Sequence, residues 1–257
     1  MDGIVFGICT LVGIVGTWHA ARDARRLRNR SEYRIARAAR AVGFGVATVG
    51  VLMAVPAVER LLEDLTGVNN SARLGTHICV VLWCGGLQLM LVDWSYNHEV
   101  LRASLYARVA LGIVVLAAML LLFIATIGPE AEITTRFAEE PGVTVYLLVY
   151  LTYVAITCGE ITFLCSGMAL STARRGHTWT ARGLTTSAAA AILGAAYAIS
   201  KGSYLVLHYL RHPWSLRYEE IVSTLLAGLA TVALITGLTM AMVGRRLTQR
   251  KDDQLTA

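Results

Sequence analysis

Seven runs of about 20 apolar residues constrain this chain more than any other feature, because a helix of that length crosses the hydrocarbon core of a bilayer. Inside lipid every backbone polar group needs an internal partner, and continuous apolar runs satisfy this need as helices. The composition agrees, since only 16% of the 257 residues are charged, against about 25% in soluble domains. We therefore expect an all-α, polytopic membrane protein, a bundle of seven transmembrane helices at residues 3–21, 37–60, 73–95, 105–127, 143–171, 183–210 and 219–243.

The basic residues between these runs predict the orientation. One set of connecting segments, together with the C-terminal tail, holds 17 of the 23 Lys and Arg residues, and the opposite set holds five. Because cytoplasmic loops carry an excess of Lys and Arg, we expect the N-terminus outside and the C-terminus in the cytoplasm. Asp2 precedes the first run and arginines follow it, the reverse of a cleaved signal peptide. Residues 1–243 should then form one transmembrane domain, followed by a short basic and polar tail at 244–257.

The charge balance and the motifs disfavour several classes of protein. The net charge of +6 follows from topology, so we expect contact with anionic membrane lipids and none with nucleic acid. The five cysteines lie inside apolar runs without a C-x-x-C spacing, which predicts neither a disulfide framework nor a metal site. The chain has no H-E-x-x-H, G-x-S-x-G or P-loop motif, so we expect no enzyme and no cofactor. A retinal Schiff base is disfavoured, because it would require a lysine on the last helix and Lys201 lies on the sixth. A haem between His77 and His208 is disfavoured as well, because the sequence does not place paired histidines on one helix.

Lys201 stands in the middle of an apolar run, where an ammonium is costly unless it snorkels, pairs or lines a wet cavity. Tyr197, Lys201, Tyr204 and His208 are spaced to share one face of a helix. Lys201 lies roughly 14 Å below the outer end of that helix at 1.5 Å per residue. We expect it to line an outward-facing cavity and to pair with Glu219 or Glu220, with outward snorkelling as the alternative.

A second polar stripe follows the fifth run. It comprises Tyr146, Tyr150, Tyr153, Thr157 and Glu160, again on one face. We interpret the two stripes as walls of a shared interior, with Glu160 too deep to meet Lys201 and near Arg174, His19 or Asp93. Gln88 could hydrogen-bond between helices. The predicted ligand-binding residues are Lys201, Tyr197, Tyr204, His208, His77, Tyr150, Tyr153, Glu160, Glu219 and Glu220.

These features leave three functions open. We favour a receptor or sensor-like protein that binds an extracellular ligand in an outward-facing polar cavity. A small-solute transporter is the alternative, and it would need a polar route to both faces. A docking protein for a secreted partner is the third, using the acidic outer loop at 128–142. The basic inner loops could contact a cytoplasmic partner.

Several segments together resemble a known family: "AVPAVERLLEDLTGVNNSARLGTHICVVLW", "RFAEEPGVTVYLLVYLTY", "LGAAYAISKGSYLVL" and "IVSTLLAGLATVALITGLT". They are similar to actinobacterial seven-helix membrane proteins classed as transporters, a label that leaves their molecular role undefined. The resemblance implies a bacterial plasma-membrane protein with His77 and Lys201 as candidate site positions. Many members continue into a cytosolic domain after the last helix, where this sequence reads "RRLTQRKDDQLTA". Any output would then use another protein or the basic inner loops.

Overall fold

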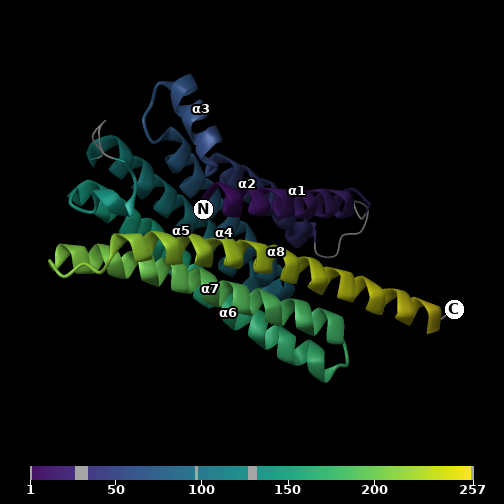
Figure 1. Ribbon diagram of the computed structural model, residues 1–257. Coiled ribbons are helices and arrows are strands. Elements are labelled where there is room, and N and C mark those ends of the chain that lie inside the picture. The colour runs from purple at the N-terminus through teal and green to yellow at the C-terminus, as the bar shows by residue number, and fades with distance from the viewer. Residues whose placement is uncertain (1, 27–33, 96–97, 127–131, 256–257) are drawn as a thin grey trace.

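The fold is a bundle of long helices (Figure 1). The structure is a computed structural model that describes residues 2–26, 34–95, 98–126 and 132–255, and it contains no strand in those ranges. Six helices are long and apolar enough to cross a membrane, or seven if one bent pair counts as a single span. The elements are α1 (Asp2–Arg26), α2 (Arg34–Met53), α3 (Pro56–Thr66), α4 (Ser71–Ser95), α5 (His98–Thr126), a 3-10 turn η1 (Thr135–Phe137), α6 (Pro141–Arg174), α7 (Thr178–Tyr209) and α8 (Leu216–Leu255).

The bent pair corrects the second predicted span, which was expected as one helix over 37–60. The chain instead turns by 86° between α2 and α3. Pro56 causes the break, because the residue before a proline is driven out of the helical region, and Val55 is extended at φ −72° and ψ 124°. α3 buries none of its residues and projects away from the axis of α2 (Figure 1).

Six of the helices form a closed ring. In chain order α1 packs against α2, α2 against α4, α4 against α6, α6 against α7, α7 against α8, and α8 returns to α1. α5 lies outside this ring, against α4 and α6, and it is the most apolar of the candidate spans and the least buried. α2 and α4 therefore face α7 and α8 across the centre of the ring.

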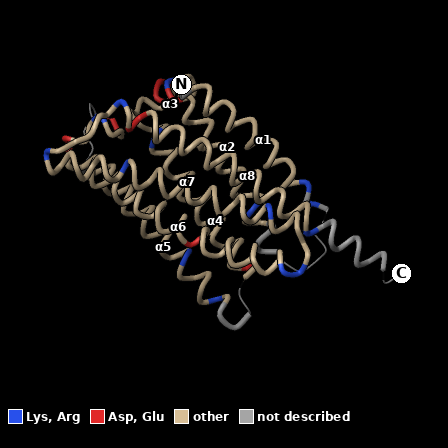
Figure 2. The backbone as a smooth tube through the Cα atoms, turned by 60° about the horizontal axis from the view of Figure 1, so that its bottom comes forward, with Lys and Arg blue, Asp and Glu red and all other residues tan. Residues whose placement is uncertain are grey.

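The two ends of the ring differ in charge, as Figure 2 shows. Acidic residues gather around the N-terminus and α3, whereas a group of basic residues marks the opposite end, from which α8 leads to the C-terminus. We call the first the acidic end, formed by the start of α1, by α3, by residues 132–140 and by the start of α8. The second is the basic end, formed by the end of α1, the α6–α7 turn and α8 beyond Gly244. α8 continues as a helix to Leu255, through most of the segment expected as a tail.

Small residues allow the closest helix contact, between α7 and α8. A Cβ added at Gly183 would lie 2.3 Å from the backbone nitrogen of Ala241, and one at Gly237 would lie 2.7 Å from that of Ser187. Backbones at this distance tolerate no side chain, as in small-x-x-x-small packing in membranes. Small residues also allow contacts of α1, where Gly13 and Gly16 pack against neighbouring side chains, whereas Gly3 and Gly7 face open space.

Candidate functional site

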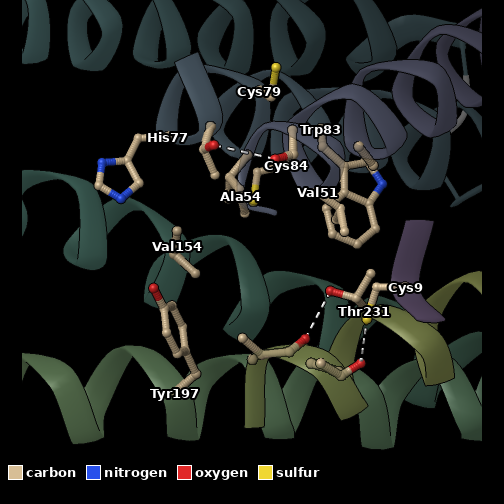
Figure 3. Close-up of a pocket in the computed structure, with 18 of the residues that line it drawn as sticks. Cys9, Val51, Ala54, His77, Cys79, Trp83, Cys84, Val154, Tyr197 and Thr231 are labelled. Atoms are coloured by element: carbon tan, nitrogen blue, oxygen red, sulfur yellow. Dashed lines mark hydrogen bonds between the residues drawn. The ribbon is translucent and has the colours of Figure 1, made fainter. Parts of the chain in front are cut away.

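The centre of the ring is hollow. A cavity of about 360 Å³ opens between the helices, and all six ring helices contribute to its wall. This volume falls within the roughly 300–1,000 Å³ of small-molecule sites. Figure 3 shows the hydroxyl of Tyr197 directed into the cavity from α7, toward the side on which His77 of α4 lies. No residue of α5 belongs to the described wall, so α5 supports the ring from outside.

The wall is polar at the acidic end and apolar below it. Its charged residues are Glu59, Arg73 and Lys201, all near the acidic end. Along α7 the wall runs from Lys201 down to Ala190, about 16 Å of helix at 1.5 Å per residue. The deeper wall is built from aliphatic side chains, Trp83 and thiols, among them Val51, Val154, Leu234, Cys9, Cys84 and Cys158. Among the described residues no three His, Cys, Asp or Glu side chains are grouped to hold a metal ion.

Lys201 turns into the ring. Its Nζ lies 5.7 Å from the centre of the ring of Tyr197, the residue one helical turn nearer the basic end. Side chains of a helix tilt toward its N-terminus, which for α7 is the basic end. A snorkelling lysine would extend the other way, toward His208 and the acidic end. The side chain is half-buried and lines the cavity, which supports the cavity position over the snorkelling alternative.

The expected partners of Lys201 are engaged elsewhere. Glu220 forms an ion pair with Arg136 at 2.6 Å, and the fully buried Glu219 accepts a hydrogen bond from the Thr135 hydroxyl at 2.8 Å. Both donors belong to residues 132–140, which fold back onto the acidic end. The predicted pairing of Lys201 with Glu219 or Glu220 is wrong for this structure, because this loop supplies other partners for both carboxylates.

The same loop also reaches the other side of the ring. Glu132 pairs with Arg73 of α4 at 2.7 Å, and the Ile133 amide donates to the Asn70 side chain at 2.9 Å. Arg73 pairs in addition with Glu59 of α3 at 2.5 Å. Residues 132–140 thus connect α4 with α8 over the acidic end. Of the acids expected to dock a secreted partner, Glu132 serves this internal contact, Glu139 and Glu140 are exposed, and Glu130 lies outside the described residues.

His77 stands between two tyrosines of α6. Its ring stacks on Tyr150 with centroids 4.3 Å apart, and its Nδ1 lies 3.1 Å from the Tyr146 hydroxyl. His77, Tyr150, Tyr197 and Lys201 all line the cavity. These four are the members of the predicted set that the structure brings together in its wall.

The polar stripe of α6 is mainly a contact seam with α4 and α5 rather than a cavity wall. The Tyr153 hydroxyl donates to Gln88 of α4 at 3.4 Å, and the Gln88 amide donates to Glu160 at 2.7 Å. Glu160 also accepts from Arg108 of α5, whose Nε lies 2.9 Å away. The predicted hydrogen-bonding role of Gln88 is confirmed. Arg174, His19 and Asp93 were the wrong partners for Glu160, because Arg108 approaches from the peripheral helix.

Tyr204 and His208 lie above the cavity. The buried Tyr204 ring packs edge-on against Trp214 with centroids 6.2 Å apart, and it tilts against His208 at 6.0 Å. Neither residue belongs to the cavity wall. Both sit on the predicted face of α7, but that face is longer than the cavity, and its last turns form an aromatic cluster at the acidic end.

The basic half of the ring is filled. Below the deepest wall residues, the side chains of Phe44, Met90, Leu91 and Leu238 are at most 2% exposed. A separate cavity of about 30 Å³ lies at the basic end between α1, α2 and α8, and Phe44 lines it. The large cavity is therefore closed toward the basic end by close-packed side chains.

Comparison with known proteins does not assign the chain to a family. No family model matches the chain, and no curated protein or solved structure is similar to it at a significant level. The resemblance to actinobacterial seven-helix proteins therefore stays a prediction, and function has to be argued from the cavity.

Proposed function

We propose that this chain is a plasma-membrane protein that binds an extracellular ligand in the central cavity, as a receptor or sensor-like module. The observation that carries the proposal is the closed ring around a cavity of about 360 Å³ with its charged residues at one end. Concave, largely apolar sites with a few convergent polar groups are typical of ligand binding. The ligand would enter from the acidic end and meet Lys201, Tyr197, His77 and Tyr150.

The filled basic half supports binding over passage. A transporter would need a second route, and the small cavity beyond Phe44 is the observation that favours this second candidate. In that case Phe44 would have to move aside, because it is 2% exposed and lies between the two cavities. A binding protein needs no such movement.

Access to the cavity separates the two candidates. In a cysteine-free variant, a single Thr224→Cys would place a thiol in the cavity wall near the acidic end. We expect a small impermeant thiosulfonate to label it from outside in intact cells and not from inside in inverted vesicles. A variant that keeps only Cys165, which is fully buried and outside the wall, is the control that should resist both. Labelling from both sides would favour the transporter, and labelling from neither would contradict the binding proposal.

Orientation is a separate prediction, because the cavity faces outside only if the acidic end does. Glu139 at the acidic end and Thr178 at the basic end are both exposed. In the cysteine-free background, an impermeant maleimide added to intact cells should label Glu139→Cys and leave Thr178→Cys unlabelled until the membrane is opened. The reverse pattern would place the cavity mouth in the cytoplasm.

A further inference from the structure

We infer that the ligand is an amphiphile with one anionic head and one apolar body, the head at Lys201 and the body along the deeper wall. This rests on the proposed function, since it names the chemical class that the same cavity would take. Its chemistry is that of a fatty acid or a single-chain alkyl phosphate, drawn from the bilayer or from the outside medium.

The cation that would bind an anionic head is Lys201 rather than Arg73. Arg73 has two carboxylate partners, Glu59 at 2.5 Å and Glu132 at 2.7 Å, so its charge is more than compensated within the protein. Lys201 lines the same cavity and has no carboxylate within ion-pair distance among the described residues. Its contact is the Tyr197 ring, and a cation–π contact is weaker than a charged hydrogen bond. A half-buried ammonium in a membrane span favours an anionic partner, which a ligand head would provide.

Donors around Lys201 fit an anionic head as well. Tyr197, His77 and Thr76 line the same cavity as Lys201, and the Tyr197 ring lies 5.7 Å from its Nζ. Hydroxyl and imidazole groups donate hydrogen bonds to carboxylate or phosphate oxygens. The Thr76 hydroxyl is turned toward backbone oxygens of Gly50 and Ala72, so Tyr197 and His77 are the nearer candidates. Charged hydrogen bonds of this kind are the strong ones.

The deeper wall selects an apolar body. Between Lys201 and the filled basic half, the described wall residues include no charged side chain. The polar side-chain groups at this depth are few: the Thr231 hydroxyl, which donates to the Ala227 carbonyl at 2.8 Å, and the Trp83 indole N–H. A sugar or a small hydrophilic anion carries more polar groups than these can satisfy, and burying such groups without partners costs free energy. A hydrocarbon body has no polar groups to leave without partners, and its transfer from water is favourable by about 25 cal/mol for each Å² buried. The elongated shape along α7 suits a chain that extends from the head toward Leu234.

Trp83 provides a direct readout, because it lines the cavity and is only 9% exposed. We would prepare a variant that keeps Trp83 as its single tryptophan, in phosphatidylcholine nanodiscs, and titrate it with dodecanoate brominated along the chain. Bromine quenches an indole that it contacts. Brominated dodecyl phosphate, dodecanol and dodecyltrimethylammonium are the other probes. A variant that keeps Trp18 alone, 55% exposed on α1, reports probe dissolved in the lipid.

Judged by the quenching of Trp83, we expect dodecanoate and dodecyl phosphate to bind at least tenfold more tightly than dodecanol. Lys201→Met should weaken the binding of the two anionic probes by at least tenfold, while Lys201→Arg should bind them within about threefold of the wild-type affinity. Lys251→Met removes the other lysine of the chain and should leave the affinity of every probe unchanged. The quenching of Trp18 should be the same with and without Lys201.

Two results would overturn the inference. Equal binding of dodecanol, or tighter binding of the cationic probe, with no effect of Lys201→Met, refutes the anionic head and leaves a cavity that binds apolar ligands. If none of the four probes quenches Trp83, the inference that the cavity binds an amphiphile is refuted. In either case labelling of Thr224→Cys from outside only would leave the binding function standing, so the two failures are distinguishable.

Discussion

Gly237→Leu is expected to abolish the folded protein. A Cβ at this position would lie 2.6 Å from the Ser187 hydroxyl oxygen and 2.8 Å from the Gly183 carbonyl oxygen. Two of the three closest atoms are backbone, so a rotamer change cannot make room, and α7 would have to separate from α8. Overpacking by a single methylene costs about 1–3 kcal/mol, so Gly237→Ala alone should lower the midpoint of thermal unfolding. With leucine the cost should approach the whole stability, about 5–15 kcal/mol for typical proteins.

Gly159→Leu is the matched control. Gly159 is an exposed glycine inside α6, and an added Cβ meets nothing within 4 Å. Leucine also favours a helix over glycine by up to about 1 kcal/mol. This variant should remain monodisperse in size-exclusion chromatography and unfold at or above the wild-type temperature. Wild-type behaviour of Gly237→Leu would show that α7 and α8 are not in close contact.

Arg108→Leu should be the second most damaging change. It leaves Glu160 with the Gln88 amide alone, 2.7 Å away, in the part of the bundle where α5 meets α6. Removing one member of a buried ion pair costs about 3–5 kcal/mol, because an uncompensated charge remains. Arg108 and Glu160 side chains are 18% and 21% exposed, so the lower part of that range applies. Thermal unfolding in nanodiscs would measure the loss.

The double variant Arg108→Leu with Glu160→Leu tests the reason for this loss. It removes both charges, and replacing a buried pair by apolar residues is often neutral or stabilising. We expect it to unfold closer to the wild-type temperature than either single variant, which gives a large coupling in a double-mutant cycle. Additive losses would mean that Arg108 and Glu160 act independently and that α5 is held by apolar contacts alone.

The spans could be predicted because hydrophobicity is a property of the sequence itself. The helix break at Val55–Pro56 was also visible in principle, since "VPAVER" puts proline ahead of a charged, short helix. Because the apolar run continues across Pro56, the hydropathy pattern predicted one helix over 37–60 in spite of the proline. The α7–α8 glycines were missed for a different reason, because the same residues in an isolated helix are only weak helix formers and gain meaning from the facing backbone.

Partners across helices could not be predicted, because depth is fixed by residue number but rotation and neighbour order are not. Tyr150 and Tyr153 share a face of α6, yet Tyr150 lines the cavity while Tyr153 reaches Gln88. Arg108 was counted among the basic residues of the connecting segments, although it lies within α5 and pairs with Glu160 of α6. Glu219 and Glu220 were at a suitable depth for Lys201 and were engaged by a loop whose fold no periodicity reveals.

The most direct test is an electron cryomicroscopy structure of the full chain in lipid nanodiscs with bound dodecanoate. Six helices should enclose a ligand whose head meets Lys201. We expect elongated density inside the ring, with an oxygen within about 4 Å of the Lys201 Nζ, the distance that defines an ion pair. A ring collapsed so that α2 and α4 pack directly on α7 and α8, or a Lys201 side chain turned outward to the headgroups, would contradict it.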